Sequence, residues 1–133
     1  MPAHVVNGVL DASKTPSSLS RPIQQNLLRR DLGFEGLIIS DAMDMGAITT
    51  QYLPEEAAVM PIKAGTTMLI YSCNSAAGGR KNSHSVDDML ETVLTIQRHI
   101  AKECKSDKDL LIQINQSYEL LNSIFGKRPR KVR

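Results

Sequence analysis

Three short apolar segments alternate with helical patterns along the first half of the chain. The strand-like segments are 2–6, 36–40 and 67–71. The second begins at Gly36, the third comes shortly after Gly65, and polar residues follow the apolar run of each, which is typical of parallel strands that are buried on both faces. Strands that alternate with helices in this order indicate βα units with right-handed crossovers.

Two helices are expected between these strands. The first spans about 18–33, with a serine as its N-cap and Gly33 as its C-terminal stop. The second spans about 54–63 and begins with a proline and two acidic residues. Pro61 lies deep inside the second helix and removes one of its backbone hydrogen bonds, so we expect this helix to be bent or divided in two.

Two long amphipathic helices close the chain. Ser85 and Asp88 have the spacing of a capping box at the start of the first. The second begins at about Asp107 and ends at Gly126.

An aspartate, Asp41, directly follows the strand 36–40. In α/β folds the chemistry gathers where parallel strands end, so this position suits a nucleophile or a general base. The alternative is a carboxylate that only caps a following helix. Asp44 lies three residues further on, where a surface or capping role is the simpler interpretation.

Length and charge limit the possible functions. A chain of 133 residues with 41% apolar content is long enough for one domain with a core, and too short for two. The net charge is +2, but five of the 16 basic residues lie in 127–133, and the rest of the chain is slightly acidic. Charge therefore favours neither a nucleic acid nor a membrane as partner. We expect 127–133 to be a disordered basic tail, with anion binding by charge alone as the alternative.

The cysteines, histidines and N-terminus add no further function. Cys73 and Cys104 have neither redox spacing nor a histidine cluster beside them, so no metal site and no cofactor is expected. We see neither an export signal nor an apolar run of membrane-spanning length, and the compartment of the protein stays unknown.

Several motifs extend over almost the whole chain. They are MPAH at 1–4, TPSSLS at 15–20, LRRDLGFEGLIISD at 28–41, EEAA at 55–58, KAG at 63–65 and INQS at 114–117. Together they resemble glycoside hydrolase family 3, and within it the β-N-acetylhexosaminidases. The run 32–45 is the most specific part of this resemblance.

The resemblance implies an α/β fold, part of a TIM (β/α)₈ barrel. About three parallel strands would match strands 6 to 8 of the family barrel, followed by the two C-terminal helices. A complete barrel needs roughly 200 to 250 residues. We therefore expect 1–126 to be the C-terminal portion of such a barrel, whose missing N-terminal half would be its partner.

The resemblance also implies roles for three residues. Asp41 matches the family nucleophile, which forms a covalent glycosyl-enzyme intermediate in a retaining mechanism. His4 and Met45 match positions that contact the sugar, although His4 also suits a hydrogen-bonded core histidine and Met45 a core methionine. The acid/base group of this branch lies on a loop that nothing in the chain matches.

The expected function is that of a fragment of a retaining exo-β-N-acetylhexosaminidase, which hydrolyses terminal β-linked N-acetylhexosamine. Without its acid/base group, the isolated chain should be inactive. One alternative is a β-glucosidase or β-xylosidase of the same family. Another is a noncatalytic half-barrel that binds sugar or pairs with a separate N-terminal chain.

Overall fold

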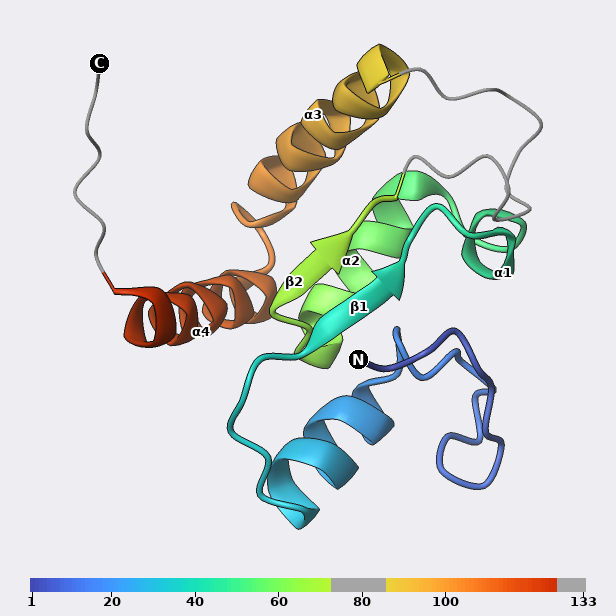
Figure 1. Cartoon of the computed structure of the whole chain (residues 1–133), viewed down its shortest axis with the longest axis vertical. Coiled ribbons are helices and arrows are strands. Elements are labelled where there is room, and N and C mark those ends of the chain that lie inside the picture. Colours follow the sequence, from blue (N-terminus) through green and yellow to red (C-terminus); the bar gives the residue numbers. More distant parts are fainter. Residues whose placement is uncertain (73–85, 127–133) are drawn as a thin grey trace.

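Helix α2 (Pro54–Ala64) lies at the centre of the fold. The computed structural model describes residues 1–72 and 86–126. In Figure 1, α2 lies behind a small sheet and the other helices surround it. The helices that contact α2 are the π-helix η1 (Pro22–Asp31), α1 (Gly46–Thr49), α3 (Val86–Glu103) and α4 (Lys108–Phe125).

The sheet consists of β1 (Ile39–Ala42) and β2 (Met68–Ile70), which are parallel as predicted. The expected third strand at 2–6 does not join them, and the sheet of the described residues has two strands. Val6 instead forms an isolated antiparallel bridge with Pro16. The segment 2–6 is thus paired with its own following loop. The α/β class holds, but the prediction of three strands is wrong for this part of the chain.

The first predicted helix forms as η1, with wider turns than an α-helix. The amide of Leu32 donates to the carbonyl of Leu27 at 2.9 Å, five residues back. Ser20 Oγ accepts from the amide of Ile23 at 3.2 Å, so a serine does stabilise the start of this helix. Gly33 follows η1 with a φ of +64°, which only glycine adopts readily, and the predicted stop is confirmed.

Helix α2 is continuous through Pro61, so it is not divided in two, and a bend at Pro61 stays a prediction. Pro61 has no amide hydrogen to donate to the carbonyl of Ala57, and the helix ends three residues later. At the other end, the Glu56 carboxylate accepts from the amide of Leu53 at 3.2 Å. Gly65 ends the helix with a φ of +107°.

Helix α4 follows the predicted range, and the predicted long helix before it is α3. Asp107 is the N-cap of α4, where its side chain accepts from the amide of Leu110 at 3.0 Å. Its other carboxylate oxygen accepts from Lys63 Nζ at 2.7 Å, which joins α4 to α2. Gly126 ends α4 with a φ of +68°. Ser85, Cys73 and the basic tail lie outside the described residues.

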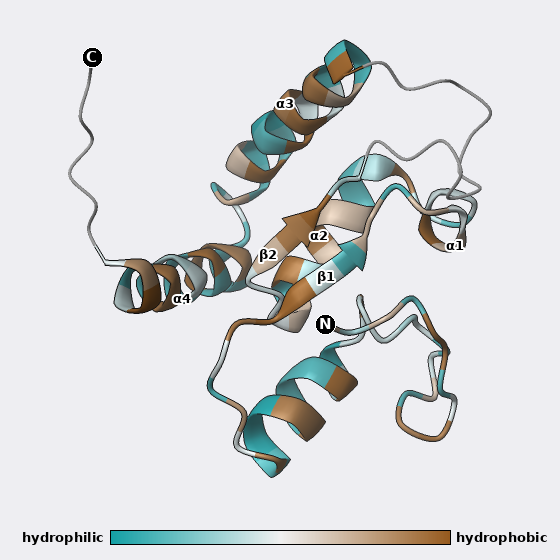
Figure 2. Ribbon diagram, in the orientation of Figure 1, coloured by the Kyte–Doolittle hydropathy of each residue, from teal (hydrophilic) through white to brown (hydrophobic). Residues whose placement is uncertain are grey.

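The hydrophobic core lies between α2, the sheet and the loop before η1. Figure 2 shows that β2 is apolar throughout, whereas apolar and polar residues alternate along α3 and α4. No described helix has the length and hydropathy that crossing a membrane requires. The buried cluster comprises Leu19, Met43, Ile48 and Ala57, with Tyr52, Met60, Leu69 and Tyr71 packed against it.

Candidate active site

Asp41 is the penultimate residue of β1, so the sheet itself fixes its backbone. Its side chain is half-buried, and Oδ1 accepts from the amide of Ala42 at 2.8 Å. The prediction placed Asp41 just beyond a strand that ended at Ser40. The observed strand begins and ends later, but it still delivers the aspartate at its carboxyl end.

His4 reaches β1 from the N-terminal segment. Its Nε2 donates to the carbonyl of Ala42 at 2.8 Å, because a carbonyl can only accept. Its Nδ1 lies 2.6 Å from the buried hydroxyl of Ser18, from which a neutral ring accepts. Both ring nitrogens therefore have protein partners, as a hydrogen-bonded core histidine would. Contact between His4 and a sugar stays a prediction.

Met45 lies shortly after Asp41 in the chain. Its amide donates to the carbonyl of Ala42 at 3.2 Å, and its extended backbone forms the N-cap of α1. Its side chain is half-buried. The structure therefore joins the His4 ring, from the N-terminal segment, and the backbone amide of Met45 to the carbonyl of Ala42, the residue after Asp41.

Asp44 joins the loops that follow β1 and β2. Its Oδ1 accepts from the amide and the hydroxyl of Ser72, both at 3.0 Å, and its Oδ2 accepts from the same hydroxyl at 2.9 Å. Sequence reasoning left Asp44 as a surface or capping residue and missed this contact. The pairing depends on the register of two strands about 30 residues apart, and no local pattern signals it.

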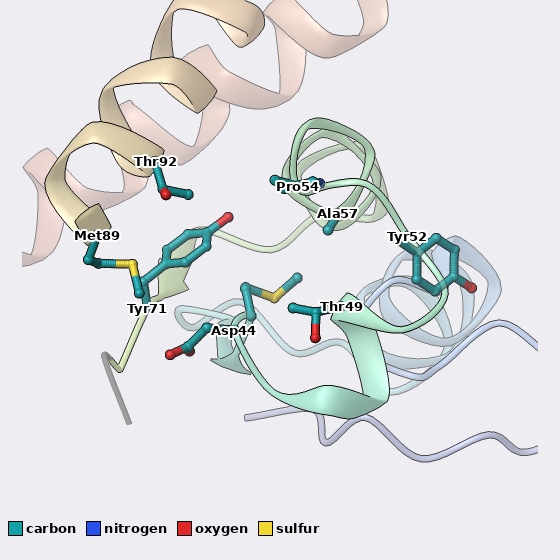
Figure 3. A pocket seen from close by; sticks show the side chains of 9 residues that line it. Asp44, Thr49, Tyr52, Pro54, Ala57, Tyr71, Met89 and Thr92 are labelled. Carbon is teal, nitrogen blue, oxygen red and sulfur yellow. The ribbon is translucent and has the colours of Figure 1, made fainter. Parts of the chain in front are cut away.

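A pocket of about 150 Å³ lies beside the ends of the two strands. Figure 3 shows its side chains, which come from α1, α2, α3 and the loops after β1 and β2. His4, Asp41 and Met45 do not line it, so it is distinct from the cluster around Ala42. Its lining residues are Met43, Asp44, Thr49, Tyr52, Pro54, Ala57, Tyr71, Met89 and Thr92.

A buried aspartate organises the loop before η1. Asp11 accepts from the amide of Ser13 at 2.9 Å and from the hydroxyl of Ser20 at 2.6 Å. The hydrogen bonds from the Ser13 and Ser20 side chains hold the pKa of Asp11 below its usual value of 3.8. The polar composition of this loop was visible in the sequence, but its inward-facing carboxylate was not.

Possible metal ligands and one cysteine thiol are the other reactive groups to consider. Among residues 1–72 and 86–126, no group of three His, Cys, Asp or Glu side chains is arranged to hold a metal ion. Cys104 is a free thiol. Partial burial, together with the nearby charges of Asp107 and Glu103, raises its pKa.

Comparison with known proteins assigns the chain to a protein family. The family model described as the glycosyl hydrolase family 3 N terminal domain matches residues 1–103. The chain belongs to glycosyl hydrolase family 3. The matched region contains His4, Asp41 and Met45, and the resemblance in the sequence motifs is confirmed at the level of the family.

Individual family members agree with this assignment. A β-hexosaminidase of Psychromonas ingrahamii is 32% identical over 112 residues, which cover 84% of this chain and 31% of that protein. A β-xylosidase of Formosa agariphila is 34% identical over 68 residues, covering 48% of this chain and 9% of that protein. The crystal structure of a β-N-acetylglucosaminidase from Thermotoga maritima matches with a TM-score of 0.66 and 26% identity, over 97% of this chain and 25% of that one. The chain thus spans less than a third of each.

Proposed function

We propose that this chain is part of the catalytic domain of a retaining exo-β-N-acetylhexosaminidase, in which Asp41 is the nucleophile. The position of Asp41 carries the proposal, because it is half-buried at the carboxyl end of a parallel strand in the family-matched region. The hydrogen bond to Oδ1 orients the carboxylate. Among the described residues Oδ2 accepts no hydrogen bond, so it is the oxygen that attacks.

The proposed reaction has two steps. In the first, Asp41 Oδ2 forms a bond to the anomeric carbon of a terminal β-linked N-acetylhexosamine. The glycosidic C–O bond breaks, and the acid/base group gives its proton to the departing oxygen. In the second step, water attacks the same carbon and the bond to Asp41 breaks. The proton lost by water returns to the acid/base group, and the sugar leaves with its original configuration.

His4 and Met45 are proposed to contact the sugar beside Asp41. The ring of His4 and the backbone amide of Met45 donate to the Ala42 carbonyl, so the His4 ring and the Met45 backbone are held next to the proposed nucleophile. The thioether of Met45 offers an apolar surface to the sugar ring. His4 offers the edge or face of its ring, because its two nitrogens already have protein partners.

The acid/base group and the remaining strands are proposed to belong to the rest of the barrel, outside these 133 residues. Within the described residues, β2 pairs with β1 alone, and Met68 is 41% exposed. An open strand edge of this kind is suited to pairing with a further strand. The isolated chain is therefore expected to show no turnover. A noncatalytic half-barrel that pairs with another chain is the alternative that this edge favours.

The matched β-xylosidase favours a second candidate activity within the same family. The two candidates can be separated by comparing the hydrolysis of an aryl β-N-acetylglucosaminide with that of an aryl β-xyloside. The enzyme for this comparison is the chimera described in the next paragraph. Faster hydrolysis of the xyloside would reject the hexosaminidase assignment while leaving the role of Asp41 intact.

A chimeric enzyme tests the proposal, because the isolated chain should be inactive. Residues 1–103 replace the matching segment of the β-hexosaminidase from Psychromonas ingrahamii. A 2-fluoro glycosyl trap followed by peptide mass mapping should place the label on Asp41. Asp41→Asn should lower kcat/KM by about a thousandfold or more, since an amide cannot replace the carboxylate nucleophile.

Asp31→Asn is the matched control, because Asp31 is an exposed aspartate paired with Arg30 on the surface. It should leave the activity of the chimera unchanged. Label on Asp44 instead of Asp41, or an active Asp41→Asn chimera, would sink the proposal.

A further inference from the structure

A buried hydroxyl without a hydrogen-bond partner faces the pocket beside the strand ends. Tyr71 Oη is shielded from solvent, and no group in the described residues bonds to it. Figure 3 shows this hydroxyl pointing between α2 and α3, toward Pro54 and Thr92. Leaving such a donor buried and unpaired costs stability, so a structure that keeps it has a use for it or an occupant beside it.

The hydroxyl is a donor at neutral pH. Burial first, and then the negative charge of Asp44, raises the pKa of Tyr71 to about 12. A proton therefore stays on Oη, and the group that satisfies this donor is one that accepts a hydrogen bond. Because Asp44 also lines the pocket, its charge disfavours an anion there. The favoured partner of Tyr71 is a neutral oxygen acceptor.

The rest of the pocket is mostly apolar. Met43 and Met89 contribute adaptable thioethers, and Pro54 and Ala57 contribute aliphatic surface. Its volume of about 150 Å³ is that of a cavity known to hold benzene. A sugar ring does not suit these walls, because most of its hydroxyls would be buried without partners.

We infer that this pocket binds a neutral carbonyl compound about the size of one six-membered ring, whose oxygen accepts a hydrogen bond from Tyr71. The apolar part of the ligand lies against Met43 and Met89. This site goes beyond the proposed glycosidase function, because none of the residues assigned to that reaction lines the pocket.

Two probes of matched shape test the inference on the full 133-residue chain. Cyclohexanone has the acceptor oxygen, and methylenecyclohexane has the same shape without it. With methyl-¹³C methionine, the NMR signals of Met43 and Met89 should shift on titration with either probe. Cyclohexanone should bind about tenfold more tightly, which is the typical effect of one hydrogen bond that a buried donor would otherwise lack.

Tyr71→Phe keeps the ring and removes only the hydroxyl. It should bring the affinity for cyclohexanone down to that for methylenecyclohexane and should leave the melting temperature equal or higher, because an unpaired polar group is gone. Tyr52→Phe is the control, since Tyr52 lines the same pocket but its hydroxyl points away from Tyr71 (Figure 3). The control should bind both probes as the original chain does.

The inference would be overturned by equal affinity for the two probes, by no binding of either, or by a preference for cyclohexanone that survives Tyr71→Phe. Shifts of Met43 and Met89 on addition of N-acetylglucosamine would overturn it too, because the pocket would then be a sugar subsite. If Tyr71→Phe fails to fold by circular dichroism, the two probes on the original chain decide the matter alone. A failure to label Asp41 in the chimera leaves this inference untouched.

Discussion

The segment before β1 and the two C-terminal helices are attached to the fold by different kinds of contact. The N-terminal segment buries polar side chains, namely Asp11, Ser18, Ser20 and Gln24. Helices α3 and α4 instead bury the apolar residues Met89, Ile96 and Leu110. Hydrogen bonds are directional and fix a segment in one place, whereas apolar contacts tolerate small shifts. The polar attachment includes His4, which bonds to Ser18 and to the carbonyl of the residue after Asp41.

The C-terminal helices also leave much of their apolar surface uncovered. Seven of their large apolar side chains, together with the aromatic ring of Tyr118, are exposed on the described parts of the chain. They are Val86, Leu90, Leu94, Leu111, Ile112, Tyr118, Ile124 and Phe125. The contrast between polar anchoring and apolar packing can be tested by substitutions in each region.

The largest effect is expected at Leu110, which anchors α4 and is fully buried. Leu110→Ala removes apolar contacts and leaves a cavity, so it should lower the free energy of unfolding by about 3 kcal/mol. Urea denaturation followed by circular dichroism measures this. Leu111→Ala is the control: Leu111 is 42% exposed, and its truncation should cost less than about 1 kcal/mol. Similar losses for the two variants would show that α4 is not anchored through Leu110.

Gln24 should give the next largest effect. Its amide nitrogen donates to the carbonyls of Ser17 and Ser18, and its amide oxygen accepts from the hydroxyl of Thr66 at 2.8 Å. Gln24→Ala leaves these buried groups without their hydrogen-bond partner, so it should lower the free energy of unfolding by about 2 kcal/mol. Asn26→Ala, on the exposed side of η1, is the control and should change it little. An effect of Gln24→Ala no larger than the control would remove the basis for calling this attachment polar.

A smaller loss is expected at Ser18, whose hydroxyl meets the His4 ring. Ser18→Ala should destabilise the chain by about 1 kcal/mol. In the chimera it should also lower kcat more than it raises KM, because His4 would be held less firmly beside Asp41. Thr50→Ala is the control: Thr50 is exposed, lies inside the segment that the chimera carries, and should change neither quantity when replaced. Equal changes for the two variants would show that the His4 contact does not position the site.

The smallest effect concerns pH. The hydrogen bonds from Lys63 and from the amide of Leu110 lower the pKa of Asp107 below its usual 3.8. A lowered folded-state pKa adds stability that is present above the unfolded-state pKa and is lost as the pH falls through the folded-state value. The melting temperature of the original chain should therefore exceed that of Asp107→Asn at pH 6, and the difference should shrink below about pH 4. A difference that stays constant down to pH 2 would contradict this.

Local signals were sufficient for much of the fold. Gly33 and Gly126 end their helices with positive φ angles, and Asp107 begins α4, as their residue types indicated. Each of these predictions depends on the conformational preference of one residue or on a hydrogen bond within one turn. The position of Asp41 at the end of a strand could also be predicted from neighbouring residues, because an apolar segment followed by a polar pair is visible in the sequence.

The rest depended on partners far away in the chain. The segment 2–6 has the composition of a strand but pairs with its own following loop, through the bridge between Val6 and Pro16. The contact between Asp44 and Ser72 and the unpaired hydroxyl of Tyr71 arise only when β1 and β2 align. Periodicity reports which face of an element is apolar, and it does not report which side chains meet across elements.

The peptide group between Ala42 and Met43 is bonded on both sides. Its carbonyl accepts from the His4 ring and the Met45 amide, and its N–H donates to the carbonyl of Ile70 at 2.8 Å. This group can turn only if the N-terminal segment and β2 both release it. Amide hydrogen exchange at Met43 should therefore be slow and should require a cooperative opening instead of local fraying. The exchange rate of the Met43 amide therefore measures how often the N-terminal segment, the β1 end and β2 separate together.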